Sequence, residues 1–378
     1  MKVFSLSTSI TSFSLLSYLT FIIFAPYLQV DFPIAKKVFF YTALIFIPFT
    51  FVQPAFWERL YFLSNGLLVF LIVYPIFLIS INVIFDTGGL AEISTFISIY
   101  FVIAAITQPK VMRIFLQFAI VVNLVALLYE FWNSSYIFEN FYNMSGEAVR
   151  SISVASYGDV GFRAKGFFSG PLDATSFIIF SALIFRNRGL FLSLCLASAL
   201  LTNGRLAIIV CGILVLRSYK LSFKALLYIS LLVPATIIFL SQFQESAAFE
   251  NLLSVFDLTS NSNVGRIFYI ISGVEYLLSV DFFSFLFGSS VPFLESTDGH
   301  SAESGLVSMF IVHGFVGFVF LLVIFSGFMS HLKREFLILA IIFLCLCIYR
   351  FDVGFMRSFF LYYLLLYASG ETFYDNYR

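Results

Sequence analysis

The chain has 378 residues and no formal net charge, and 61% of its residues are hydrophobic while only 11% are charged. Its mean hydropathy of +1.00 exceeds what the core of a water-soluble domain absorbs, because globular chains are only about 45 to 50% apolar. The charge balance excludes a nucleic-acid-binding protein, which needs a basic surface. The composition therefore predicts an integral membrane protein.

Cysteines and the N-terminus exclude two further classes. Four cysteines lie inside apolar runs, without a histidine at metal-site spacing: Cys195, Cys211, Cys345 and Cys347. We therefore expect no disulfide, no metal and no cofactor. The apolar stretch that follows Lys2 is too long for a signal peptide and lacks a small-residue cleavage site, so we expect an uncleaved first span.

Apolar runs separated by polar breaks predict the membrane spans. Because about 20 apolar residues cross a hydrocarbon core of about 30 Å, the chain is long enough for about 12 transmembrane helices. We therefore predict an all-α polytopic fold that forms a single membrane domain over residues 1–378. The expected spans are 9–29, 38–56, 61–84, 91–107, 112–132, 172–185, 189–203, 205–217, 223–241, 303–329, 335–350 and 354–369.

Basic residues predict which side of the membrane each connection faces. They gather in alternate connections: Lys110 and Arg113, Arg186 and Arg188, Arg217 with Lys220 and Lys224, and Lys333 with Arg334. The positive-inside rule makes these connections and both termini cytoplasmic, although Lys36 and Lys37 then fall on the external side. Two long connections, 133–171 and 242–302, become external (periplasmic) loops. Long ordered loops are usually functional, so we expect the function there.

Several cations on the external side are not explained by orientation. Arg163 and Lys165 lie in "GFRAKGFFSGPLDATSF", Arg205 lies in the tight turn of "LLTNGRLAIIV", and Arg266 opens "GRIFYIISGVEYLL". A guanidinium carries a permanent charge and a planar fork of donors that matches phosphate oxygens. Three arginines at one external pocket would therefore suit a phosphate or pyrophosphate. For each arginine alone, a side chain that extends to the lipid headgroups is the alternative.

The second long loop holds a predicted amphipathic helix and a histidine. Arg266, Tyr269, Gly273 and Tyr276 share one face at helical spacing, and the opposite face is expected along the membrane: Ile267, Ile270, Ile271, Val274 and Leu277. His300 precedes an apolar span and is a candidate general base or hydrogen-bond donor. An ordinary loop histidine is the alternative, and three carboxylates nearby could replace it: Glu295, Asp298 and Glu303.

Three blocks in order along the chain resemble the bacterial O-antigen polymerase (Wzy) family and its relative, the O-antigen ligase family. The first is "FRAKGFFSGPLDATSFIIF", with an Arg-x-x-Gly element before a Pro turn. The second is the "NGR" turn of "LLTNGRLAIIV". The third runs from "NSNVGRIFYIISGVEYLL" to "HSAESGLVSMFIVHGFVGFVFLL", as a large external loop between Gly-Arg and His. Asp173 departs from the family pattern, where an Asn or a small residue is expected.

The resemblance implies an enzyme that polymerises undecaprenyl-pyrophosphate-linked oligosaccharide repeat units into O-antigen or capsular polysaccharide. The expected location is the outer face of the bacterial inner membrane. Arg163, Arg205 and Arg266 would bind the pyrophosphate with Lys165 in support, and Arg205, Arg266 and His300 would be catalytic. The expected partners are the lipid-linked oligosaccharides and membrane lipids, with a chain-length regulator as a candidate. An O-antigen ligase acting on lipid A core and a lipid-linked oligosaccharide flippase or exporter remain alternatives.

Overall fold

The computed structural model describes about half of the chain. The described residues are 2–31, 33–54, 57, 101–102, 104–105, 107–138, 140–142, 148–151, 163–168, 170–218, 261–289, 293, 296–297, 304–308, 310–312, 314–316 and 318–319. The chain forms two compact units. One comprises Met1–Ile22, Phe40–Met112 and Val264–Arg378, and the other comprises Ile23–Phe39 and Arg113–Asn263.

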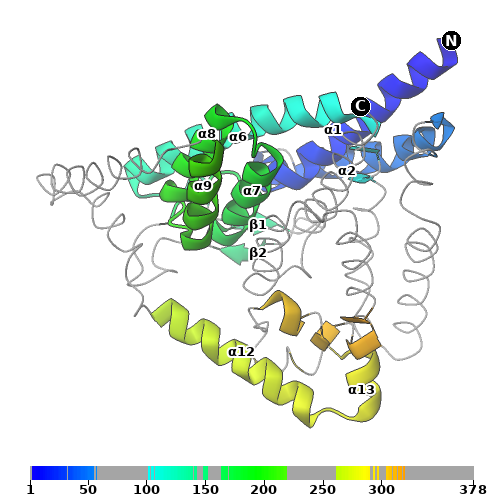
Figure 1. Cartoon of the computed structure of the whole chain (residues 1–378). Coiled ribbons are helices and arrows are strands. Elements are labelled where there is room, and N and C mark those ends of the chain that lie inside the picture. Colours follow the sequence, from blue (N-terminus) through cyan, green and yellow to red (C-terminus); the bar gives the residue numbers. More distant parts are fainter. Residues whose placement is uncertain are drawn as a thin grey trace, which may run out of the picture. The chain divides into compact units, whose positions relative to one another are not determined.

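The described part is predominantly helical (Figure 1). The helices are α1 (Lys2–Asp31), α2 (Pro33–Phe46), the 3₁₀ helix η1 (Ile47–Val52), α6 (Pro109–Asn133), α7 (Pro171–Ile184), α8 (Gly189–Leu201), α9 (Arg205–Ser218), α12 (Asn261–Ser279) and α13 (Phe282–Phe287). Helices were expected over 9–29, 112–132, 172–185, 189–203 and 205–217, and this is confirmed. The expected helix over 38–56 is confirmed as helical as far as Val52, but it changes from the α-helix to η1 at Ile47, beside Pro48, which has no N–H to donate. The predictions for 61–84, 223–241, 335–350 and 354–369 lie outside the described residues.

One feature departs from the all-α expectation. Within the first long loop, β1 (Asn140–Tyr142) and β2 (Ala148–Ser151) pair as an antiparallel ribbon with Phe141 opposite Arg150. The register shifts between Phe141 and Tyr142. A chain that leaves a helix must pair its backbone groups elsewhere, and a short ribbon does this locally.

Helix α6 has the form of a membrane span. Among the described residues it is the one helix that is long and apolar enough to cross a membrane, judged by length and composition. Its exposed apolar side chains recur at helical spacing and form one stripe: Ile114, Phe118, Val121, Val125, Leu128 and Trp132. Its opposite face is buried in the protein and includes Leu116, Asn123, Leu127 and Glu130. A helix with one protein-facing side and one exposed apolar side is suited to a lipid boundary.

Helices α7, α8 and α9 pack together as a small bundle (Figure 1). They have 14, 13 and 14 residues, so each is about 20 Å long. That is shorter than the roughly 30 Å of a hydrocarbon core. Their small side chains allow close packing, and Ala174, Ala182, Ala199 and Ala207 are all buried.

The turn between α8 and α9 is a Schellman motif. Asn203 adopts a left-handed conformation with φ of 51°. The Gly204 N–H donates to the Ala199 carbonyl at 3.2 Å, and the Asn203 N–H donates to the Leu200 carbonyl at 3.1 Å. These two bonds satisfy carbonyls that the end of a helix leaves open. The "TNGR" sequence therefore ends α8 and starts α9 within three residues.

Gly204 is required by the contact between this turn and α7. A Cβ at residue 204 would lie 2.7 Å from Thr175 Oγ1 and 2.8 Å from Thr175 Cγ2. We expect Gly204→Ala to destabilise the protein by about 1 to 3 kcal/mol, because the crowded turn must shift. The double variant Gly204→Ala, Thr175→Ala removes both clashing atoms and should recover most of this loss. Chemical denaturation in detergent measures both, and a Gly204→Ala variant as stable as the parent would contradict the packing.

In the other unit, α1 packs on α2 and η1 through buried polar contacts. The Ser14 hydroxyl donates to the Ala43 carbonyl at 2.7 Å, and Gln53 Nε2 donates to Thr11 Oγ1 at 2.8 Å. Tyr18 stacks on Phe101, with ring centroids 3.8 Å apart. Side-chain hydrogen bonds of this kind join helices whose surfaces are otherwise apolar.

Candidate functional site

The loop over residues 163–168 is built around the carboxylate of Glu130. This side chain is buried near the end of α6. Its Oε2 accepts the backbone N–H groups of Lys165 and Gly166, each at 2.8 Å, and its Oε1 accepts the Ile137 N–H at 3.1 Å. Hydrogen bonds to a charged group are roughly twice as strong as neutral ones. One carboxylate therefore anchors the chain on both sides of the β ribbon to α6.

Asn123, two turns earlier on α6, completes the support of this loop. Its Oδ1 accepts the Phe167 N–H at 3.2 Å. Gly166 has a φ of +54°, and a Cβ there would collide with the same Oδ1 atom. Because only glycine combines that backbone with that contact, Gly166 allows the loop to lie directly on α6.

Lys165 is buried, although we expected it to support a bound pyrophosphate. The side chain has no solvent exposure. Its Nζ donates to the Phe168 carbonyl at 3.5 Å and lies 5.3 Å from the centre of the Tyr136 ring. The ammonium and the Glu130 carboxylate also attract each other. A buried cation needs such partners, so Lys165 is the counter-charge of Glu130 rather than a cation that faces solvent.

Arg163 extends from this loop to the turn that carries Arg205. Tyr136 Oη donates to the Arg163 carbonyl at 3.1 Å, which holds its backbone. Its Nε lies 3.4 Å from the Thr202 carbonyl oxygen at the end of α8. Thr202 is three residues before Arg205, so Arg163 reaches the turn from which α9 and Arg205 begin, at one end of the α7–α9 bundle. Both side chains are half-buried.

Arg205 occupies the first position of α9, where a cation does not stabilise the helix. The N-terminus of a helix carries a partial positive charge, and a cation there is unfavourable by a few tenths of a kcal/mol to about 1 kcal/mol. The N-terminus of α7 lies at the same end of the bundle, because Thr175 of α7 contacts Gly204. Two helix N-termini and two arginines therefore lie at this end of the bundle, together with the carboxylate of Asp173 in the first turn of α7, whose charge offsets part of theirs.

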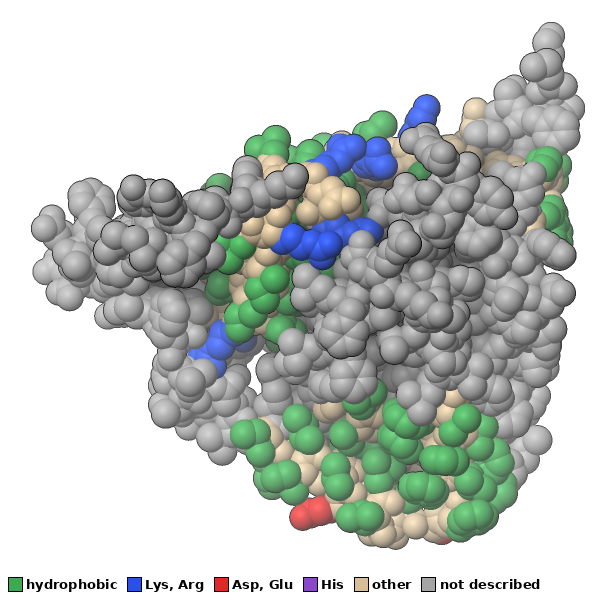
Figure 2. Space-filling model, viewed as in Figure 1, with side chains coloured by type: hydrophobic (Ala, Val, Ile, Leu, Met, Phe, Trp, Pro, Cys, Tyr) green, Lys and Arg blue, Asp and Glu red, His purple; other side chains and the backbone are tan. Residues whose placement is uncertain are grey.

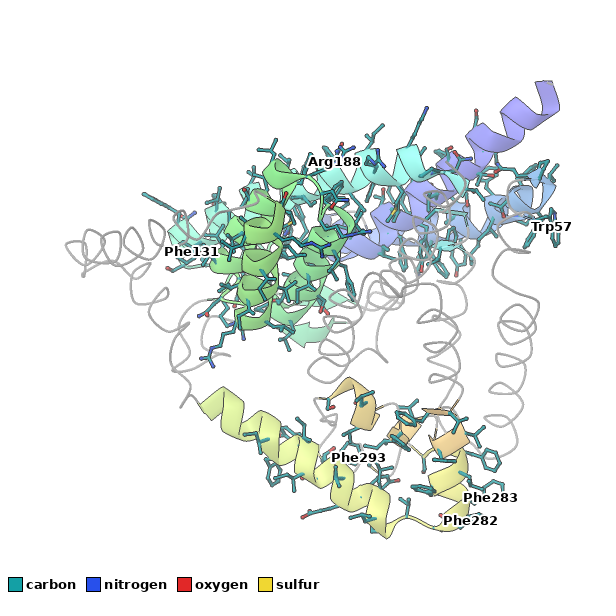
Figure 3. All side chains as sticks on the ribbon, in the orientation of Figure 1. Trp57, Phe131, Arg188, Phe282, Phe283 and Phe293 are labelled. Carbon is teal, nitrogen blue, oxygen red and sulfur yellow. The ribbon has the colours of Figure 1, made fainter. Side chains whose placement is uncertain are left out.

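The other end of the bundle carries a separate group of cations. Arg186 and Arg188 lie between α7 and α8, and Arg217 lies in the last turn of α9. Figure 3 labels Arg188 at the start of α8, the opposite end from the turn at Thr202. The hairpin formed by α8 and α9 thus separates the cations assigned to the cytoplasm from Arg163 and Arg205.

The remaining candidates are described only in part. Arg266 lies in the first half of α12, and the amphipathic helix predicted for this segment is therefore present. The position of the Arg266 side chain is not among those that the structure describes. His300 and the nearby carboxylates Glu295, Asp298 and Glu303 also lie outside the described residues. Within the described part of the chain, no group of His, Cys, Asp and Glu side chains could hold a metal ion.

Asp173, the departure from the family pattern, lies in the first turn of α7. A carboxylate there interacts favourably with the positive end of the helix. This local role explains an acidic residue at the same end of the bundle as the arginines.

Sequence reasoning missed the residues that position Arg163. These are Glu130 and Asn123 on α6, Tyr136 after it, and Thr202 at the end of α8. Glu130 carried a usable signal, because an ionisable residue at the edge of an apolar span is costly and marks a functional or structural site. Tyr136 and Thr202 carried none, since their roles depend on contacts across 27 and 39 residues of sequence.

No protein-family model matches the chain, and no curated protein matches it. The resemblance to the O-antigen polymerase family therefore rests on the three short motifs, their order and their expected sidedness.

Proposed function

We propose that the chain is a polytopic membrane enzyme that polymerises undecaprenyl-pyrophosphate-linked oligosaccharide units at the outer face of a bacterial inner membrane. The observation that carries the proposal is the meeting of Arg163 with the turn that presents Arg205. The two residues lie in the first two of the three motifs that resemble the family. Their shared location is what a pyrophosphate site built from those motifs requires.

In this proposal the chemistry is a glycosyl transfer. A hydroxyl of one repeat unit attacks the anomeric carbon of the sugar on the other lipid carrier, and the bond from that carbon to the pyrophosphate oxygen breaks. Arg163 and Arg205 stabilise the negative charge that develops on the leaving pyrophosphate. This lowers the barrier because the leaving oxygen carries more negative charge in the transition state than in the bound substrate. Arg266 is the proposed third cation, and His300 is the proposed base for the hydroxyl proton.

The proposed architecture has twelve membrane spans with both termini in the cytoplasm. Twelve spans explain why 61% of the residues are hydrophobic. Support comes from α6, which has the length and the exposed apolar stripe of a span. Further support comes from the α8–α9 hairpin, because its turn carries Arg205 and its other end carries the cations assigned to the cytoplasm.

A reconstitution assay with defined substrates tests the proposal. Purified full-length protein in vesicles is given undecaprenyl-pyrophosphate repeat units, alone or with lipid A core, and the products are separated by size. We expect a ladder of lipid-linked polymer without lipid A core. Transfer only to lipid A core would instead identify a ligase, and translocation without any new glycosidic bond would identify a flippase. In the same assay, His300→Ala should lower the rate at saturating donor more than the apparent donor affinity.

A further inference from the structure

Helix α12 and the short α13 present an apolar face that the rest of the described chain leaves uncovered. It is formed by Ile267, Ile271, Val274 and Leu278 on α12 and by Phe282 and Phe283 on α13, all of them exposed. The four α12 positions recur at intervals of four, three and four residues, so they form one stripe along the helix. Figure 2 shows hydrophobic side chains gathered over this region. Contiguous apolar surface of this kind marks an interaction site.

The opposite side of α12 packs against the protein. Phe293 and Ile311 are buried, and Tyr276, Leu277 and Val307 pack against them. The Tyr276 hydroxyl donates to the Ser289 carbonyl at 2.9 Å. In Figure 3, Phe293 lies beside α12, whereas Phe282 and Phe283 lie on α13. Leu277, which we expected on the membrane side, is therefore a packing residue, and Leu278 replaces it on the exposed stripe.

The last turns of α12 add a third, polar sector. Glu275 and Ser279 are exposed beside the apolar stripe, on the side away from Leu277, whereas the exposed Phe268 makes the same side apolar nearer the start of the helix. In its last turns the helix thus presents three sectors, which face protein, apolar surroundings and water. A helix at the boundary between bilayer and water has this arrangement.

The apolar face is continuous with a segment that the sequence predicts to span the membrane. The Phe285 ring stacks on Phe315, with centroids 6.0 Å apart and planes 14° apart. The Ser289 N–H donates to the Ile311 carbonyl at 2.7 Å. Gly288 and Gly314 pack backbone to backbone, since a Cβ on Gly314 would collide with the Leu286 carbonyl. Phe315 and Val319 are themselves exposed, on the predicted span 303–329.

We propose that the apolar face of α12 and α13 inserts into the boundary between headgroups and acyl chains of a lipid bilayer, so that these two helices are held against the membrane. A face that continues the exposed surface of a predicted span meets the same lipid, and interfacial helices insert about 5 to 10 Å. This proposal rests on the predicted span at 303–329 and does not depend on the polymerase activity.

Spin labels on the full-length protein test the proposal. In a background with the four cysteines replaced by alanine, a nitroxide is placed at Ile271, Leu278 or Phe282 through single cysteine substitutions. Glu275 and Ser279 are the matched positions on the polar sector. The protein is reconstituted in vesicles of phosphatidylethanolamine and phosphatidylglycerol, and collisions with oxygen and with a water-soluble nickel chelate are compared. We expect the nitroxides at the three apolar positions to collide mainly with oxygen and those at the two polar positions to collide mainly with the nickel chelate.

Two results would overturn the proposal. Nickel access at Leu278 equal to that at Glu275 would place the face in water. Protection from both reagents, with dipolar broadening between labels, would show that a second copy of the chain covers it. Because the cysteine replacements include the buried Cys195 and Cys211, the wild-type chain is also tested in vesicles that contain a diazirine phospholipid. We expect photolabelled peptides from 267–283, and labelling confined to other segments would refute lipid insertion.

Discussion

Replacing Arg205 with alanine is expected to abolish long glycan chains while leaving the protein folded and inserted. Removing one preorganised group that stabilises developing negative charge lowers kcat by about 100- to 1,000-fold. The variant should still fold, because the substitution removes a half-buried side chain at the first residue of α9, where a positive charge opposes the helix dipole. The product ladder made by reconstituted protein measures the first effect, and thermal unfolding in detergent measures the second.

Two further variants make this result specific. Arg205→Lys keeps the charge and loses the planar fork, so we expect part of the activity to remain. Arg188→Ala removes an exposed cation at the opposite end of the bundle, where no hydrogen bond from its side chain caps α8. Its ladder should match that of the parent protein. A normal ladder from Arg205→Ala would remove this residue from the mechanism.

Among the substitutions considered, we expect Glu130→Ala to lower the free energy of unfolding the most. The substitution leaves three backbone N–H groups without their acceptor, those of Ile137, Lys165 and Gly166. It also leaves the buried Lys165 ammonium without its counter-charge. Breaking a buried pair from one side costs about 3 to 5 kcal/mol. Because the loop also positions Arg163, we expect the remaining folded protein to bind the donor more weakly.

Conservative variants separate the charge from the hydrogen bonds. Glu130→Gln keeps one acceptor oxygen and should be less damaging than Glu130→Ala. Adding Lys165→Met to Glu130→Gln removes the unpaired ammonium, so we expect the double variant to be more stable than the sum of the two single effects. Denaturant unfolding of the four proteins gives the coupling energy. Strict additivity would show that the two side chains do not interact.

The helices of this protein were predictable because they follow from local pattern. Apolar runs ended by "TNG", or by a polar break such as "RNR", are sufficient to specify α7, α8 and α9. The amphipathic spacing of α12 also predicted its exposed face at Ile267, Ile271 and Val274. The replacement of Leu277 by Leu278 on that face was not predictable, because it depends on where Phe293 and Ile311 pack.

The sequence by itself determined a mostly helical chain with a membrane protein's composition, and it singled out Arg163 and Arg205 as cations without a local purpose. Tertiary structure alone decided that Arg163 reaches the α8–α9 turn that leads into Arg205, and that Lys165 is buried in the loop that Glu130 anchors. The physical reason is the sequence separation over which each interaction acts. Helix periodicity and turn chemistry act over a few residues, whereas Glu130 binds the chain 35 and 36 residues later, and Arg163 reaches 39 residues to Thr202. Such contacts exist only once the helices have packed.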